Sequence, residues 1–364
     1  MTATSTARGA APRLLVVRND KLGDFMLAWP ALARLKAASP APRVSVLVPA
    51  YTVPMARLCP WVDEVLLDPG DGASRAEQRR LLAEVKAARF DALLTLFSTP
   101  RIGWLGWRAG IPLRLAPATK WAQLFYNRRV VQRRSRSEKP EYRYNIELAE
   151  ALLSELDLTP DIEPEPPWWP LPEGERRAQR RRLAEELGLD PARSWVFLHG
   201  GSGGSAVNLS PAQYVRLVQE VDARLPMERR AQWVLTAGPG EEATAEAILA
   251  PLRKAGLEAQ RLPPRAGLED FARTLAAADL FVAGSTGPLH IAGCLDIATA
   301  GFYPAHRSAT PLRWQTCNHA ERRLAFCPPA DAGEQDMATI DIPAAAEAVS
   351  DLLCRLPAAV TSGS

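Results

Sequence analysis

DLFVAGSTGPLH, residues 279–290, decides the fold of this chain, because an apolar strand runs straight into a turn of small residues and then into a new helix. A turn of this kind directs backbone N–H groups toward an anion. Thr286 adds a hydroxyl, Gly287 lets the backbone come close, and Pro288 suits the first helical position, where its missing N–H costs nothing. His290 is predicted to face the same opening. Taken alone, the stretch also fits an ordinary strand-to-helix turn of an α/β domain.

Residues 14–30, LLVVRNDKLGDFMLAWP, repeat the pattern of buried strand, glycine-bearing turn and helix, and their turn ends in a carboxylate, Asp24. Two more glycine-containing turns follow apolar strands, WVLTAGPGEE at 233–242 and HGGSGGS at 199–205. Ligands of open parallel sheets bind outside the carboxyl ends of the strands. These turns are therefore predicted to lie at the binding edges of their sheets.

Strands and helices alternate along the chain, which predicts parallel sheets with crossover helices. The prolines of residues 161–170 forbid regular structure and predict a stiff, extended connector between two domains. We expect a tail at 1–12, a first Rossmann-like domain at 13–160, a linker at 161–172, a second Rossmann-like domain at 173–342, and a final helix with a tail at 343–364. The expected strands are 13–17, 44–48, 64–67, 92–96, 195–199, 233–236, 281–283 and 299–303, with helices at 75–89 and 173–187.

Composition sets bounds on function. A chain of 364 residues with 47% hydrophobic content can build two cores, and its net charge of +3 is too small to indicate a nucleic-acid binder. The five cysteines are odd in number and lack C-x-x-C spacing, which is typical of reduced thiols in a cytosolic protein and not of a disulfide or zinc framework.

The sequence carries no signal for membrane insertion. Residues 1–12 lack an apolar core and are expected to form a loose tail, not a signal peptide. No run approaches the ~20 apolar residues that a transmembrane helix needs. Any membrane contact is therefore expected to be peripheral.

In order and spacing, the segments at 14–30, 233–242 and 279–290 resemble those of the heptosyltransferases, glycosyltransferase family 9, which build the inner core of lipopolysaccharide. The N-terminal pattern of that family, an apolar strand, a basic residue, Leu/Met-Gly-Asp, an apolar helix and Pro-Ala-Leu, is met here by Arg18, Leu22, Gly23, Asp24, Pro30, Ala31 and Leu32. The resemblance implies the GT-B architecture, in which two Rossmann-like domains face each other across a cleft and the final helix, here 343–356, packs back on the first domain.

The resemblance also implies a reaction, the transfer of a heptose or related sugar from an ADP-sugar to a lipopolysaccharide inner-core acceptor with inversion at the anomeric carbon. Such a transfer needs a base for the acceptor proton and positive charge or N–H dipoles for the departing diphosphate. Asp24 matches the catalytic aspartate of the family. The alternative role for Asp24 is to cap the following helix.

Donor binding is assigned to the second domain. Glu241 resembles the family carboxylate that meets the ribose, although an acidic residue is also favourable in the first turn of a helix. The glycine-rich loop at 199–205 precedes a helix opened by Ser210 and supplies further N–H donors. The expected donor-binding residues are Ser202, Gly203, Asn208, Glu241, Ser285, Thr286, Gly287 and His290.

Two departures from the family pattern fall in that donor site. Ser285 stands where relatives usually carry Asp, and Asn208 stands where they carry a Lys or Arg that binds phosphate. Because Asn is neutral, a cationic partner of the leaving group has to come from elsewhere, with Arg307, Arg313 and Lys21 as candidates. The departures leave the donor open to a related nucleotide sugar.

Residues 101–145 carry eleven Lys or Arg against only Glu138 and Glu141, in the domain where the family binds its acceptor. Arg forks pair well with the phosphates and carboxylates of an anionic glycolipid, and nearby tryptophans would suit an anionic membrane surface. A solvated loop is the alternative. The expected acceptor-binding residues are Lys21, Arg57, Arg128, Arg129 and Arg143. The enzyme is expected in the cytoplasm, at the cytoplasmic face of the inner membrane.

A resident metal or cofactor is not expected. The four histidines are dispersed and no D-x-D pattern is present, so we predict a metal-independent enzyme whose only small-molecule partner is its nucleotide-sugar co-substrate. Two other readings remain open. A nucleotide-sugar epimerase can use the same fold but needs no acceptor site, and a non-catalytic sugar-nucleotide-binding homologue would have no use for Asp24.

Overall fold

A computed structural model describes residues 11–118, 121–203 and 207–357. The predicted N-terminal tail lies almost entirely outside these residues, as do Lys120 and part of the glycine-rich loop. The chain divides into two compact units, the first formed by residues 1–133 and 141–165 and the second by residues 134–140 and 166–364. The division at 165 and 166 falls inside the stretch that the sequence indicates as a connector.

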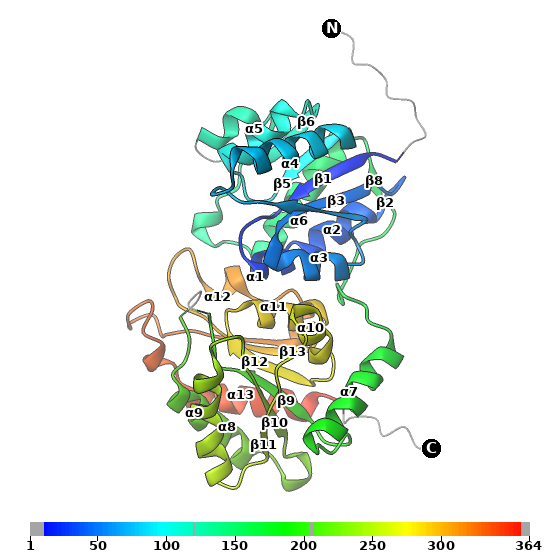
Figure 1. Ribbon diagram of the computed structural model, residues 1–364. Coiled ribbons are helices and arrows are strands. Elements are labelled where there is room, and N and C mark those ends of the chain that lie inside the picture. The colour runs from blue at the N-terminus through cyan, green and yellow to red at the C-terminus, as the bar shows by residue number, and fades with distance from the viewer. Residues whose placement is uncertain (1–10, 119–120, 204–206, 358–364) are drawn as a thin grey trace. The chain divides into compact units, whose positions relative to one another are not determined.

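The first unit is built on a parallel sheet whose described strands follow the order β4-β3-β1-β5-β6-β7 (Figure 1). All four residues of β5 are buried, as expected of a strand covered on both faces by crossover helices. The elements are β1 (Arg13–Val17), α1 (Leu22–Met26), α2 (Trp29–Lys36), β2 (Ala38–Ser39), β3 (Arg43–Pro49), η1 (Ala50–Thr52), α3 (Val53–Leu58), β4 (Glu64–Asp68), α4 (Arg75–Ala88), β5 (Ala92–Thr95), α5 (Pro100–Arg108), β6 (Leu113–Pro117), η2 (Trp121–Phe125), β7 (Arg128–Val130), α6 (Glu141–Glu155) and β8 (Thr159–Pro160).

The second unit repeats this design with a sheet of order β11-β10-β9-β12-β13-β14. Its elements are α7 (Glu173–Leu187), β9 (Trp195–His199), α8 (Pro211–Arg224), η4 (Met227–Arg229), β10 (Gln232–Thr236), α9 (Glu242–Lys254), β11 (Ala259–Arg261), α10 (Leu268–Leu275), β12 (Leu280–Gly284), α11 (Gly287–Cys294), β13 (Ala298–Phe302), α12 (Pro311–Trp314), η5 (Ala320–Arg322), β14 (Arg323–Phe326), η6 (Met337–Thr339) and α13 (Ile342–Arg355). The short helix η3 (Arg134–Arg136) also belongs to this unit.

The two sheets share a strand order that creates a switch point in each. In each sheet the unit's first strand, β1 or β9, lies in the middle. The strands that follow it in the chain lie on one side, and β5 or β12 is the first strand on the other side. Parallel pairing aligns the carboxyl ends of neighbouring strands, as in the register of Val17 with Thr95 and of His199 with Ala283. Ligands of such sheets bind at the switch point, so the turns after β1, β9 and β12 are the positions to examine.

The expected α/β class and every expected strand and helix are confirmed to within a residue or two at each end. Four described strands of the two large sheets are absent from the sequence expectation, β6, β7, β11 and β14. Each is short and carries arginine or glutamine, as in RRV for β7 and AQR for β11, so hydrophobic runs do not identify them. β7, β11 and β14 lie at or next to the sheet edges, where polar residues are tolerated.

The final helix belongs to the core of the second unit. There α13 packs against α8 (Figure 1). Its buried residues Ala345, Val349 and Leu353 join the core that also contains Val218 of α8. The amphipathic pattern of α13 predicts burial, but it does not specify which sheet the helix will cover.

The predicted connector forms hydrogen bonds with neighbouring segments. On its first-unit side, the N–H of Asp161 donates to the carbonyl of Ala37. In the second unit, Trp168 and Trp169 are buried, the indole Nε1 of Trp168 donates to the carbonyl of Cys317 at 2.7 Å, and the N–H of Trp169 donates to the carbonyl of Cys294 at 2.8 Å. These bonds anchor both ends of the stretch.

No helix in the described part of the chain has the length and apolar character needed to cross a membrane.

Replacement of Leu353 by Ala tests the placement of α13. Leu353 is 2% exposed, and loss of its side chain should lower the free energy of unfolding by about 2–5 kcal/mol. Urea unfolding followed by circular dichroism measures the change. Cys354→Ala, at the exposed neighbouring position, should leave the midpoint unchanged. Equal midpoints for the two variants would contradict this packing.

Candidate active site

The turn after β1 is organised around a buried arginine. Arg18 is 3% exposed, and its guanidinium contacts three carboxylates, Asp20 at 2.8 Å from Nε, Asp24 at 2.5 Å from Nη2, and Glu141 at 3.1 Å from Nη1. Asn145 of α6 donates from Nδ2 to the carbonyl of Leu27 at 3.0 Å, which fixes α6 beside the end of α1. One cation therefore holds the turn, α1 and α6 together.

Asp24 does not cap a helix. It lies inside α1, whose N-cap is Lys21, and α1 has no side-chain cap hydrogen bond. Oδ1 of Asp24 accepts from Arg18, and no described residue donates to Oδ2. The carboxylate is thus oriented by one oxygen and has the other available to a substrate hydroxyl, while 8% of the residue remains exposed. The capping alternative is wrong, because the carboxylate bonds to Arg18 instead.

Burial raises the pKa of the Asp24 carboxyl to about 6. The Arg18 guanidinium acts in the opposite direction, while the negative charges of Asp20 and Glu141 add to the rise. For Arg18, burial opposes the charged form, but the surrounding carboxylates outweigh it and raise the pKa above its ordinary value. A carboxylate with this pKa is mostly ionised at neutral pH and is a stronger base than an exposed aspartate.

A second set of bonds holds the turn from the side of β4. The Asn19 side chain donates to Oδ2 of Asp68 at 2.5 Å, and Arg101 Nη2 donates to the same oxygen at 2.6 Å. Burial acts to raise the pKa of Asp68, but the hydrogen bonds from Arg101 and Asn19 outweigh it and lower the pKa. Asp68 therefore remains a charged anchor for the backbone next to Arg18.

In the second unit, the start of α11 has the features of an anion site. Thr286 is the N-cap residue, yet its side chain makes no cap hydrogen bond. Its Oγ1 is buried without a partner, and so is Nδ1 of His290 one turn later. Buried polar atoms normally have hydrogen-bond partners, so two orphans at a helix N-terminus indicate a ligand site. Gly287 is the first helical residue and Pro288 the second, one position later than the sequence suggested.

Burial lowers the pKa of His290 to about 4, so the imidazole is neutral at physiological pH. A neutral imidazole can donate one hydrogen bond to a phosphate oxygen but adds no positive charge. Ser285 precedes the N-cap residue, and its N–H donates to the carbonyl of Phe302. The site at α11 therefore relies on dipoles.

Glu241 closes the glycine-rich loop. Its Oε1 accepts from the N–H of Gly203 at 2.6 Å and its Oε2 from the N–H of Gly238 at 2.8 Å. A Cβ on Gly201 would lie 2.1 Å from this carboxylate, so only glycine fits there. Glu241 is the N-cap residue of α9 but makes no cap bond. Its carboxylate binds the loops and not the helix.

His199 supports this arrangement from the end of β9. Its Nδ1 lies 3.0 Å from Oγ1 of Thr236, the residue paired with it in β10, and its Nε2 lies 3.4 Å from Oε2 of Glu241. Burial lowers the pKa of His199, although the charge of Glu241 opposes the shift. His199 was not among the residues expected from the sequence, although it opens the quoted glycine-rich loop. Ser202, in the same loop, is partly buried.

Asn208 has a structural role that the sequence did not indicate. Its Nδ2 donates to the carbonyls of Gly200 and Gly201, and its Oδ1 accepts from the N–H of Leu209 and the hydroxyl of Tyr214. These four bonds hold the glycine-rich loop. Both N–H groups of the amide are already used, so none is left to donate to a phosphate. This argues against direct contact between Asn208 and the nucleotide sugar.

The expected acceptor residues are spread over the first unit. Lys21 is the exposed N-cap residue of α1, and Arg57 is exposed in the last turn of α3. Arg128 pairs with Glu155 at 2.5 Å, and Arg143 lies over the ring of Tyr142 at 5.7 Å. Arg129 is exposed on β7. Only Lys21 adjoins the Arg18 cluster in the chain.

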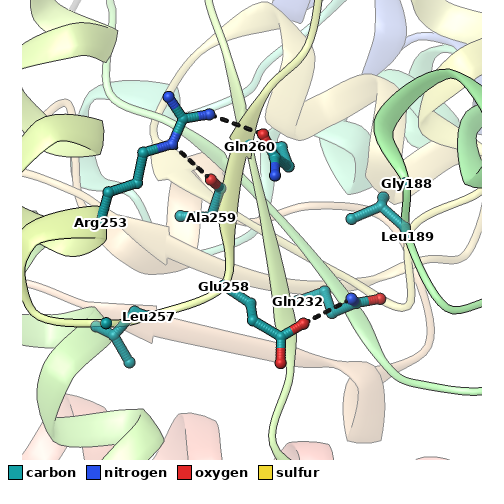
Figure 2. A pocket seen from close by; sticks show the side chains of 9 residues that line it. Gly188, Leu189, Gln232, Arg253, Leu257, Glu258, Ala259 and Gln260 are labelled. Carbon is teal, nitrogen blue, oxygen red and sulfur yellow. Dashed lines mark hydrogen bonds between the residues drawn. The ribbon is translucent and has the colours of Figure 1, made fainter.

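A pocket of about 310 Å³ lies at the amino ends of β10 and β11, the opposite edge from Thr236 and Glu241 (Figure 2). Its polar groups are already paired. Arg253 donates to the carbonyl of Ala259 and to Oε1 of Gln260, while Glu258 accepts from Gln232. This pocket does not require a ligand.

Among the described residues, no group of three or more His, Cys, Asp or Glu side chains is placed to hold a metal ion.

Two α/β units, each built on a parallel sheet with a switch point, are features of the GT-B class of glycosyltransferases. The fold matches the structure of the E. coli ADP-heptose LPS heptosyltransferase II with a TM-score of 0.72 at 20% identity, over 94% of this chain and 99% of that one. The profile of glycosyltransferase family 9 (heptosyltransferase) matches residues 78–325. The chain belongs to this family, and it is a glycosyltransferase.

Two relatives extend the comparison. A Haemophilus influenzae protein that carries only a provisional designation as a glycosyltransferase is 46% identical over 326 residues, which are 89% of this chain and 91% of that protein. Lipopolysaccharide heptosyltransferase 2 of Salmonella typhimurium is 25% identical over 315 residues, 82% of this chain and 85% of that protein.

Glu141→Gln tests the electrostatics of the Arg18 cluster. The substitution removes a negative charge that raises the pKa of Asp24, so that pKa should fall below about 6. Carbon-13 NMR of protein labelled at the aspartate carboxyls measures it directly, with the Asp24 signal identified by its loss in Asp24→Asn.

Glu155→Gln, at the other end of α6, provides the matched control and should leave the titration of Asp24 unchanged. An unaltered or higher pKa for Asp24 in Glu141→Gln would show that Glu141 does not act on it electrostatically.

Proposed function

We propose that this enzyme transfers a heptose or closely related sugar from an ADP-sugar to a lipopolysaccharide inner-core acceptor with inversion. The observation that carries the proposal is Asp24, a buried carboxylate at a switch point. Its pKa is raised to about 6, and its Oδ2 accepts no hydrogen bond from the described residues. The names of the Salmonella and E. coli relatives, both lipopolysaccharide heptosyltransferases, support the class of acceptor, and the E. coli name supports the donor.

In this reaction Asp24 takes the proton of the acceptor hydroxyl. The oxygen then forms a bond to the anomeric carbon as the bond from that carbon to the diphosphate oxygen breaks, and the nucleotide leaves with the electron pair. Inversion follows because attack and departure occur on opposite faces of the sugar. Arg18 keeps the base oriented and stabilises its charge before the proton arrives.

The leaving diphosphate is stabilised by the N-terminal N–H groups of α11, with Oγ1 of Thr286 and a neutral His290 as hydrogen-bonding partners. Because Asn208 and His290 add no charge, we propose Arg307 as the cation of this site. Arg307 is exposed in the loop after β13, the neighbour of β12, and it forms no ion pair with another described residue. Arg313 is a weaker candidate because its Nη1 donates to the carbonyl of Arg134.

The acceptor in this proposal is an anionic glycolipid at the cytoplasmic face of the inner membrane, reached by Lys21 and Arg57 near the carboxyl edge of the first sheet. We also propose that the reaction needs no metal ion, because the helix N-terminus and Arg307 would carry the charge of the leaving group. An epimerase would not need a base poised toward an acceptor. A non-catalytic homologue would gain nothing from the raised pKa of Asp24.

Asp24→Asn should reduce kcat by about 10²–10⁴-fold, because the amide cannot accept the acceptor proton, and it should leave ADP binding intact. For the wild type, kcat/KM should rise with pH through about 6 and then level off, since the base acts in its ionised form. Transfer to a lipid A and Kdo acceptor from ADP-heptose, followed by mass spectrometry, supplies both rates.

Asp71→Asn is the matched control for this experiment, because Asp71 is an exposed partner of Arg101 outside the cluster. Full turnover in Asp24→Asn would exclude Asp24 as the base. The same assays are run with EDTA, and loss of wild-type activity there would refute metal independence.

A thermal-shift panel with ADP, UDP, GDP, CMP and TDP tests the donor. A ligand that binds only the folded protein raises Tm, so ADP should give the largest shift. Thr286→Val should reduce that shift, since it removes an unpartnered hydroxyl. A larger shift with another nucleotide would replace the donor but keep the transferase, whereas no shift with any of them would favour the non-catalytic alternative.

A further inference from the structure

Large apolar side chains are exposed together on one part of the first unit. Three exposed tryptophans occur among the described residues, Trp104 at 41%, Trp107 at 53% and Trp121 at 81%, and Leu124 is 69% exposed beside them in the chain. Solitary exposed apolar residues need no explanation, but a group of this kind does. The transfer reaction uses none of these four side chains.

These residues belong to two elements that pack against each other, α5 and η2. In α5, Ile102 and Leu105 are buried, which leaves Trp104 and Trp107 on the outer face. A Cβ on Gly103 would lie 2.7 Å from Cβ of Phe125, so the two elements are in close contact. In the 3-10 helix η2, residues three apart lie above one another, which places Trp121 and Leu124 on one side. We call Trp104, Trp107, Trp121 and Leu124 the aromatic patch.

Three arginines of the segment that carries the aromatic patch differ from the other arginines there. Arg101 and Arg128 are engaged in ion pairs, and Arg114 donates to backbone carbonyls. In contrast, Arg108, Arg129 and Arg133 form no ion pair within the described residues. The guanidinium of Arg108 lies 5.8 Å from the centre of the Trp104 ring, so its positive charge contacts the patch. Arg129 and Arg133 are exposed on and just after β7, the edge strand that follows η2.

We propose that the aromatic patch and these three arginines form a docking surface for an anionic lipid bilayer. Indole rings favour the interface between headgroups and acyl chains, where an apolar body and a polar N–H are both satisfied. Unpaired arginines add attraction to anionic headgroups. Charge complementarity selects this occupant, since an apolar protein partner would leave the three guanidiniums without counter-charges. The docking surface does not depend on the sugar or nucleotide that the enzyme uses.

Vesicle co-sedimentation tests the surface with the full chain. Wild-type protein should pellet with vesicles of 30% phosphatidylglycerol in phosphatidylcholine and much less with phosphatidylcholine alone. Trp104→Ser, Trp107→Ser and Trp121→Ser combined, or Arg108→Gln, Arg129→Gln and Arg133→Gln combined, should each reduce the bound fraction by about tenfold or more.

Matched controls separate the surface from general effects. Met227→Ser removes a side chain that is 79% exposed in the second unit, and Arg79→Gln, Arg80→Gln and Arg181→Gln combined remove three charges from exposed positions of α4 and α7. Both variants should bind vesicles as the wild type does. Thermal unfolding and ADP binding confirm that every variant is folded.

A second measurement reports insertion itself. Lipids brominated on the acyl chain should quench the fluorescence of wild-type protein, and Trp104→Phe, Trp107→Phe and Trp121→Phe combined should still bind vesicles but lose most of that quenching. The proposal is overturned if wild-type protein ignores anionic vesicles, if the serine and glutamine variants bind them undiminished, or if quenching persists in the phenylalanine variant.

Discussion

The candidate site of the first unit depends on the ion pairs of the buried Arg18 guanidinium. A charge with 3% exposure is tolerated only because three carboxylates surround it, and removal of a partner from such a cluster typically costs about 3–5 kcal/mol. Burial raises the pKa of Asp24 despite its ion pair with Arg18, and the negative charges of Asp20 and Glu141 add to the rise. The same contacts that hold α1 and α6 in place thus also act on the basicity of Asp24.

The candidate site of the second unit is built from uncharged groups for the most part. Its binding edge is formed by backbone dipoles, two glycine-containing loops and neutral side chains. The amide of Asn208 forms hydrogen bonds that hold the glycine-rich loop, and burial keeps His290 uncharged. Loop shape and N–H orientation are therefore the main features of this edge, where Asn208 provides less positive charge than a lysine or arginine at that position would.

Much of the fold follows from the sequence because its central strands are continuous apolar runs ended by glycine turns, as at Val17 and Gly284. Asp24, Thr286 and His290 could be found in the same way, since each follows such a strand. Glu141 could not, because it lies 123 residues from Arg18 in the chain and only the packing of α6 joins them. The short polar strands β7 and β11 and the position of α13 likewise depend on tertiary contacts that leave no local pattern.

The bonds of Glu241 have a consequence for the energetics of ligand entry. Its carboxylate already accepts from Gly203 and Gly238, so these two glycines are held near one conformation by an internal surrogate for a ligand. Much of the entropy that glycine would lose on binding has been removed in advance. A nucleotide that draws Glu241 toward its ribose would exchange hydrogen bonds and not create them, so its affinity would come mainly from contacts made elsewhere.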